Sequence, residues 1–282
     1  MESSTSIEKP KSFRSALILS NPHSGRDYSE DFLAQSRLDS LTIRRSEDPY
    51  IDEIFKDAPI YGAPLISAQF PRSFVDPNRG PWELDPTMFS GSLPKDRVER
   101  SARALAGFGV IPRCVATGEN IYDGPIPAKI AISRLERYYH PYHAALQSII
   151  IETKKIFPKT LLIDCHSMPA VGGDQDIDKG ESRPDIILGD RYGTSCEPII
   201  MNSAKVILEK NQLKVYLNKP YAGAYTTMNY GNPKNGLNVI QLEINRGLYL
   251  NERNITKLES IKELKNKMNN FITELTAIEE LH

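Results

Sequence analysis

The sequence of 282 residues has few cysteines, no long apolar run and almost no excess of charge of either sign. Its three cysteines, Cys114, Cys165 and Cys196, lack the spacing of a metal site, which fits buried thiols in a reducing compartment. No apolar stretch approaches the roughly 20 residues that span a bilayer. A net charge of -1 gives no reason to expect nucleic acid or an anionic membrane as a partner.

The N-terminal stretch, residues 1–13, is polar and carries both charge signs. It lacks the apolar core of a signal peptide, so we expect a cytoplasmic protein. We also expect this stretch to be a flexible tail ahead of a single catalytic domain over residues 14–282. The sequence shows no internal repeat, low-complexity tract or clear linker.

Short apolar runs rich in Val, Ile and Leu alternate with segments of helical periodicity. This alternation predicts an α/β protein, a three-layer α/β/α domain with a mixed, mostly parallel sheet that is covered on both faces. The expected strands are 15–20, 64–70, 109–116, 160–164, 184–188, 213–217 and 238–244. The expected helices are 29–38, 49–57, 95–107, 127–155, 194–211 and 254–280. Pro141 should end or kink the fourth of these helices.

Two of the five histidines follow short apolar runs in the same way. The run Ala16–Ser20 leads to His23, and the run Thr160–Ile163 leads to His166. Each histidine therefore lies at the carboxyl end of an expected strand, which is the edge where open α/β sheets bind ligands. Two imidazoles at that edge, with a carboxylate from later in the chain, predict a zinc hydrolase that acts on a small molecule.

A second pair, His140 and His143, lies three residues apart at an aromatic-rich helix end. That spacing could bind a metal ion on one face of a helix. The aromatic neighbours favour a structural role instead, with one partly buried imidazole. The fifth histidine, His282, is terminal.

An amide and a guanidinium stand together in a long loop as Asn78 and Arg79. Because the planar fork of arginine matches a carboxylate, this pair predicts recognition of an acid group. The alternative is a loop that is held by a salt bridge. A second loop, 218–226, contains glycine and Tyr225 and could close over a small substrate.

Glu243 lies inside the most apolar of the late runs, 238–244. A buried carboxylate needs a partner or a function, and a raised pKa would suit a general base that acts on metal-bound water. The alternative is an ion pair with Arg246 or another arginine.

Six motifs follow one another along the chain. They are Asn-Pro-His-Ser-Gly at 21–25, Val-Asp-Pro-Asn-Arg at 75–79, Tyr-His-Pro-Tyr-His-Ala-Ala-Leu at 139–146, Asp-Cys-His-Ser-Met-Pro at 164–169, Leu-Gly-Asp-Arg-Tyr-Gly-Thr-Ser-Cys at 188–196 and Gln-Leu-Glu-Ile-Asn-Arg-Gly-Leu-Tyr at 241–249. As an ordered set over about residues 15 to 252, they resemble the N-formylglutamate amidohydrolase family. That family is similar in fold to the zinc carboxypeptidases, whose pattern includes an early histidine, an Asp-x-Asn-Arg loop, a strand-end His-Ser pair and a late glutamate.

The resemblance implies a role for each of these motifs in one active site. It implies that His23 and His166 bind one zinc ion and that Glu243 is the general base. It also implies that Asn78 and Arg79 bind a carboxylate of the substrate.

The resemblance leaves two candidates for the third metal ligand. Carboxypeptidases carry an acidic ligand three residues after the first histidine, where this chain has Arg26. Asp27 is one residue further on, whereas Asp52 corresponds to an aspartate in the pattern of the formylglutamate family. We therefore take Asp52 as the third ligand and keep Asp27 as the alternative.

The reaction implied by the resemblance is metal-assisted hydrolysis of the N-formyl amide of N-formyl-L-glutamate to formate and L-glutamate, in amino-acid catabolism and histidine degradation. A substrate with two carboxylates needs more than one cation, so Arg113, Arg191 and Arg246 are further candidates, with Tyr225 from the 218–226 loop. Two alternatives stay open. One is a related zinc deacylase or carboxypeptidase-like enzyme that acts on another N-acyl amino acid, and the other is a metal-free binding protein of the same fold. The sequence predicts no oligomeric state.

Overall fold

The computed structural model describes residues 4–94, 96–116, 118–174 and 176–281. Its backbone contacts divide the chain into two compact units. The smaller unit contains the residues up to Ser6 with 22–47 and 67–145, and the larger unit contains 7–21, 48–66 and 146–282. A single catalytic domain over 14–282 stays a prediction. Within the described ranges, no helix is long and apolar enough to cross a membrane.

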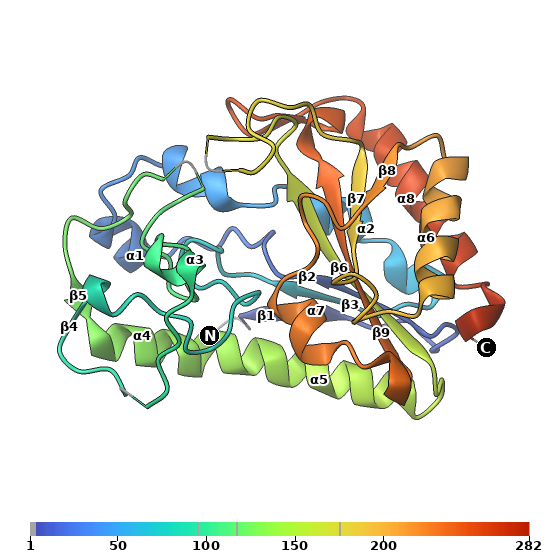
Figure 1. The fold of residues 1–282 in the computed structure, drawn as a ribbon, viewed down its shortest axis with the longest axis horizontal. Helices are drawn as coiled ribbons and strands as arrows, with labels where there is room; N and C mark the ends of the chain where they lie inside the picture. The colour runs from blue at the N-terminus through green and yellow to red at the C-terminus, as the bar shows by residue number, and fades with distance from the viewer. Residues whose placement is uncertain (1–3, 95, 117, 175, 282) are drawn as a thin grey trace. The chain divides into compact units, whose positions relative to one another are not determined.

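A seven-stranded sheet has the strand order β1-β3-β2-β6-β9-β7-β8. Its strands are β1 (Thr5–Glu8), β2 (Leu17–Asn21), β3 (Leu65–Ala68), β6 (Thr160–Met168), β7 (Ile186–Gly189), β8 (Val215–Leu217) and β9 (Leu237–Asn245). β6 pairs in parallel with β2 and β9, and β7 pairs in parallel with β8 but antiparallel with β9. All nine residues of β6 and of β9 are buried, as expected for central strands that are covered on both faces (Figure 1). The mixed, mostly parallel sheet of an α/β protein is therefore confirmed.

The helices of the larger unit pack against one another and against the sheet. α8 (Ile261–Leu275) contacts both α2 (Ile51–Phe55) and α6 (Pro198–Lys210), and it lies beside α6 in Figure 1. α7 (Tyr225–Tyr230) contacts β9, and a short ribbon joins β10 (Leu250–Asn251) to β11 (Thr256–Lys257). The inner face of α8 buries Leu264, Met268, Phe271, Ile272 and Leu275. This buried face stabilises the amphipathic helix.

The smaller unit consists mainly of loops around short elements. These are α1 (Glu30–Gln35), α3 (Ala102–Leu105), α4 (Ala128–Arg134) and the paired strands β4 (Phe89–Ser90) and β5 (Ile126–Pro127). In its interior, the guanidinium of Arg134 lies 4.1 Å from the centre of the Phe74 ring and donates to the Tyr122 hydroxyl at 2.7 Å. The aromatic face and the hydroxyl compensate the cost of burying this charge.

The prediction of a strand over 109–116 is wrong. These residues form a loop, in which the N–H of Val110 donates to the carbonyl of Glu83 at 2.8 Å. Gly107 has a φ of +98°, and a Cβ at Gly109 would lie 2.4 Å from the same Glu83 carbonyl oxygen. The two glycines allow a tight approach of the backbone that a strand does not make, so the apolar residues are buried without forming a ladder.

The helix expected over 127–155 continues through Pro141. It consists of α4, a π-helix (Leu135–Tyr139) and α5 (His140–Lys154). The N–H of His140 reaches the carbonyl of Leu135, five residues back. The π turn shifts the backbone hydrogen-bond register just before Pro141. The N–H that proline lacks is therefore not needed for the regular hydrogen bond to the carbonyl four residues back, and the helix continues.

The structure also differs from the expectation for residues 1–13. Thr5–Glu8 form the edge strand β1, and the Gln69 N–H donates to the Ser4 carbonyl at 3.0 Å. A short polar strand is typical of a sheet edge, where one side of the strand needs no partner, so the composition gave no sign of it. Residues 1–3 lie outside the described part of the chain.

Candidate functional site

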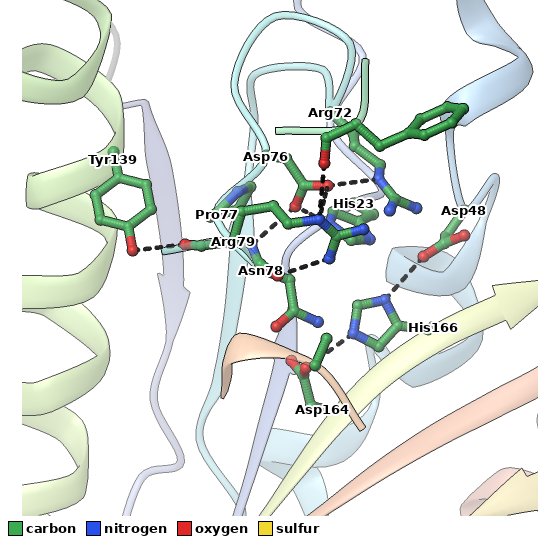
Figure 2. Close-up of polar contacts among 12 residues, drawn as sticks. His23, Asp48, Arg72, Asp76, Pro77, Asn78, Arg79, Tyr139, Asp164 and His166 are labelled. Carbon is green, nitrogen blue, oxygen red and sulfur yellow. Dashed lines mark hydrogen bonds and ion pairs between the residues drawn. The ribbon is translucent and has the colours of Figure 1, made fainter. Parts of the chain in front are cut away.

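In the larger unit, His166 lies on β6 with a carboxylate at each ring nitrogen (Figure 2). Its Nδ1 is 3.0 Å from Asp48 Oδ2, and its Nε2 is 2.8 Å from Asp164 Oδ2. Burial alone would lower the pKa of this imidazole, but Asp164, Asp48 and Glu243 outweigh that effect and hold the pKa well above 6.5. In metal sites, one ring nitrogen of a histidine is commonly oriented by a carboxylate, as Nε2 is here by Asp164, while the other nitrogen binds the ion.

Asp48 is the carboxylate that could not be singled out from the sequence. It is 1% exposed, and its Oδ1 accepts hydrogen bonds from Arg246 Nη2 at 3.0 Å and from Ser167 Oγ at 3.2 Å. Asp52, the expected third ligand, lies in the first turn of α2, and its assignment stays a prediction. Both aspartates belong to one short segment, so spacing along the chain does not choose between them.

Glu243 lies on β9 directly beside His166 on β6, because these two residues are partners in the parallel register. Its Oε1 accepts a hydrogen bond from Gln241 Nε2 at 2.8 Å. The Oε1 of Gln241 in turn accepts from the N–H of Ala224 at 2.9 Å. Since a backbone N–H can only donate, this contact fixes the orientation of the Gln241 amide and directs its NH2 group at Glu243.

In the smaller unit, His23 is 2% exposed and pairs with the carboxylate of Asp76 (Figure 2). His23 Nε2 is 2.7 Å from Asp76 Oδ1, and Arg72 Nε donates to Oδ2 at 2.9 Å. Burial alone would raise the pKa of Asp76, but Arg72, His23 and Arg79 outweigh it and hold the pKa well below 3.8. The ionised carboxylate accepts from Nε2, which places the lone pair of neutral His23 on Nδ1.

Asn78 and Arg79 are both buried in the loop that follows Asp76. The guanidinium of Arg79 donates from Nε to the Phe108 carbonyl at 3.0 Å and from Nη1 to the Asn78 carbonyl at 2.9 Å. Its Nε is 3.9 Å from Asp76 Oδ2, so the ion pair is a long one. Backbone carbonyls therefore do more to hold this guanidinium than a salt bridge does.

Comparison with known proteins identifies the family. Residues 15–250 match N-formylglutamate amidohydrolase. The chain belongs to this family. Among curated relatives, the N-formylglutamate deformylase of Pseudomonas putida is 26% identical over 242 residues, which cover 85% of this chain and 83% of the relative. The N-formylglutamate deformylase of Pseudomonas aeruginosa is 25% identical over 243 residues, which cover 85% of this chain and 84% of the relative.

A solved member of the N-formylglutamate amidohydrolase family has a similar fold. The crystal structure of N-formylglutamate amidohydrolase from Ralstonia eutropha JMP134 is 28% identical, with a TM-score of 0.89 over 97% of both chains. A gene product of Agrobacterium tumefaciens is 18% identical with a TM-score of 0.67, over 97% of this chain and 94% of that one, and supports the fold alone. The family match over 15–250 contains every site residue expected from the sequence.

The remaining expected residues of this family member lie in different places. Arg113 is 3.4 Å from Asp85 in the smaller unit. In the larger unit, Arg191 follows β7 with a φ of 54°, and Tyr225 begins α7. The alternative ligand Asp27 is exposed. Arg246 contacts Asp48. Of the additional arginines in the described structure, it is therefore the best placed to hold a candidate metal ligand.

Proposed function

We propose that this chain hydrolyses the N-formyl amide of N-formyl-L-glutamate to formate and L-glutamate. The family match and the names of both curated relatives support this substrate. The observation that carries the proposal is that each candidate histidine ligand has a carboxylate partner within its own unit. His23 pairs with Asp76, and His166 pairs with Asp164. Such carboxylate–histidine pairs orient imidazoles toward a catalytic metal ion.

We propose that His23, Asp48 and His166 together bind one divalent ion, zinc. These three buried side chains form a group of donors that could share an ion. Two imidazoles and a carboxylate fit zinc, because catalytic zinc sites use three such ligands and keep a further position for water. When bound, the ion supplies a Lewis acid that lowers the pKa of water and polarises the amide carbonyl. Asp52 is the alternative to Asp48 in this set.

Glu243 is the proposed general base. It would take the proton of the attacking water and return it to the leaving amine of the product. Its place beside His166 in the sheet supports this role, and Gln241 holds one of its oxygens. Arg246 is proposed to keep Asp48 in place, since it donates to both Asp48 and Ser167.

Substrate recognition is proposed for Asn78 and Arg79, which would bind one of the two substrate carboxylates. The guanidinium of Arg79 is already oriented by two backbone carbonyls, so little side-chain entropy is lost when a carboxylate binds. The second carboxylate needs a second cation, for which Arg113, Arg191 and Arg246 are the candidates. Tyr225 at the start of α7 is a further proposed contact.

The proposed setting is cytoplasmic amino-acid catabolism, in histidine degradation. All three cysteines are buried and free, which is in keeping with a reducing compartment.

A substrate panel tests this function. Formate or acyl release would be measured for N-formyl-L-glutamate, N-formyl-L-aspartate, N-acetyl-L-glutamate and a short peptide. We expect kcat/KM to be highest for N-formyl-L-glutamate, by about 10-fold or more. The shorter side chain of N-formyl-L-aspartate would leave one of the two proposed cations without its carboxylate, and N-acetyl-L-glutamate tests the acyl group alone, because it keeps both carboxylates. Faster cleavage of the acetyl substrate or of the peptide would assign a different acyl group or a carboxypeptidase-like activity. Metal binding without turnover of any substrate would indicate a binding protein.

A further inference from the structure

The motif Tyr-His-Pro-Tyr-His at 139–143 has no part in the chemistry proposed so far. Within the smaller unit, two of its side chains contact the loop of Asn78 and Arg79. Tyr139 donates from its hydroxyl to the Arg79 carbonyl at 2.8 Å (Figure 2). His143 Nε2 is 2.9 Å from the Pro77 carbonyl, and since a carbonyl only accepts, Nε2 carries the proton.

The carbonyl oxygens of residues 77–79 are all paired by side chains. The Pro77 carbonyl contacts His143, the Asn78 carbonyl accepts from Arg79 Nη1 at 2.9 Å, and the Arg79 carbonyl accepts from Tyr139. The Asn78 N–H donates to Asp76 Oδ1 at 2.9 Å. Buried carbonyls must be paired, and here side chains rather than a ladder pair all three. Two of the three carbonyls are therefore paired by side chains that come from one helix, and the third is paired within the loop.

The helix presents the two side chains as a unit. Tyr139 is the last residue of the π-helix, and His143 lies four residues later on α5, which places the two on one face. Their ring centres are 4.4 Å apart, and Tyr139 is 2% exposed. Single π turns occur frequently at functional sites, where they shift the register of a side chain. Here the π turn ends at Tyr139 and precedes His143.

We propose that Tyr139 and His143 are positioning residues that hold Asn78 and Arg79 in the conformation that binds a substrate carboxylate. This proposal rests on the proposed function for its substrate. The two residues then affect recognition of the carboxylate, and thus KM, but take no part in cleavage of the amide.

The test uses single variants of the full chain. Tyr139→Phe removes only the hydroxyl, and His143→Leu removes the imidazole donor. His143→Gln keeps a donor of similar reach and serves as the conservative rescue. Tyr138→Phe is the matched control, because it is the same change at the neighbouring residue, whose ring packs against Phe70 and Phe74. Arg79→Lys sets the scale for loss of the guanidinium fork.

Turnover is measured with N-formyl-L-glutamate and with its two mono-amides, N-formyl-L-glutamine and N-formyl-L-isoglutamine. We expect Tyr139→Phe and His143→Leu to raise KM for N-formyl-L-glutamate about 3- to 10-fold, as loss of one hydrogen bond would, with little change in kcat. The rise should vanish for the mono-amide that lacks the carboxylate bound by Arg79, and for both Tyr138→Phe and His143→Gln. A fall in kcat, or equal losses on all three substrates, would overturn the proposal.

Amide hydrogen exchange of the peptide that contains residues 77–79 gives a second readout that needs no turnover. Exchange at Asn78 should be faster in Tyr139→Phe and His143→Leu than in wild type or Tyr138→Phe. Unchanged exchange would overturn the proposal even in an active enzyme. If wild type fails to hydrolyse N-formyl-L-glutamate, the proposed function falls, and the exchange result alone decides whether these two side chains hold the loop.

Discussion

Glu243 and His166 are neighbours on two parallel strands, where a carboxylate could act as a metal ligand or as a base. The hydrogen bond from Gln241 favours the second role, since it uses one oxygen of the carboxylate and fixes its orientation. Gln241 is itself oriented by the backbone of Ala224. A carboxylate that is held in this way would accept a proton in a fixed orientation, as a general base must.

Replacing Glu243 by glutamine separates the two roles. Glu243→Gln keeps the shape and the neighbours of the side chain but removes the proton acceptor. We expect turnover to fall by roughly 10²-fold or more, while metal content stays at the wild-type value. Both are measured on one preparation. Loss of the ion together with activity would make Glu243 a ligand.

The choice between Asp48 and Asp52 calls for a matched pair of variants. Asp48→Asn removes a buried charge that contacts His166 and Arg246, so we expect it to lose the metal ion and to lower the free energy of unfolding by about 3–5 kcal/mol, as breaking a buried ion pair does. Asp52→Asn should keep the ion. Metal content and thermal unfolding of both variants check this. Retention by Asp48→Asn and loss by Asp52→Asn would restore Asp52 as the ligand.

How far the site could be predicted depends on how far apart its members lie in the sequence. Asp164 is two residues before His166 on one strand face, so that pair could have been found from strand periodicity. Asp76 is part of the motif at 75–79, but its contact with His23 spans 53 residues and depends on the fold. Asp48 lacks a local signal of either kind. Strand-end histidines are visible in a sequence, whereas the carboxylates that orient them are mostly not.

At the level of elements, the end of β7 supports the loop that holds Gln241. A Cβ at Gly189 would lie 2.6 Å from the carbonyl carbon of Ala222 and 2.8 Å from the carbonyl oxygen of Tyr221. The loop therefore packs directly on the strand at a glycine. Two residues further on, Ala224 makes the hydrogen bond that orients Gln241.

Gly189→Ala should push this loop away from β7. We expect a loss of about 1–3 kcal/mol in the free energy of unfolding, as for other overpacked sites, together with slower turnover because the Ala224–Gln241 contact is disturbed. Gly124→Ala is the control, since a Cβ there meets nothing within 4 Å. Urea unfolding and kcat are measured for both. Equal behaviour of the two variants would show that the loop does not depend on Gly189.

The elements that could be predicted are those with continuous burial or clear periodicity, such as β6, β9 and α8. The apolar run at 109–116 is similar in composition to a strand, but the close backbone contact at Gly109 and the positive φ of Gly107 just before it decide its path. Pro141 alone predicts that the helix ends or kinks there, and the π turn before it, which no propensity signals, explains why the helix continues. The local sequence pattern predicts which residues are buried better than it predicts the path of the backbone.

For the molecule as a whole, the proposed ion depends on ligands that lie far apart in the sequence. These proposed ligands are His23, Asp48 and His166. Each histidine contacts a carboxylate, His23 that of Asp76 and His166 that of Asp164. The central claim is that the two histidines bind one proposed ion and serve one reaction.

The most direct test of this claim measures metal content and formate release on the same preparations of wild type, His23→Ala and His166→Ala. We predict about one zinc ion per wild-type chain, in line with a single catalytic site, and formate release from N-formyl-L-glutamate. Each substitution alone should abolish both, because it removes one of the three proposed ligands. Full metal occupancy in both variants would contradict the account.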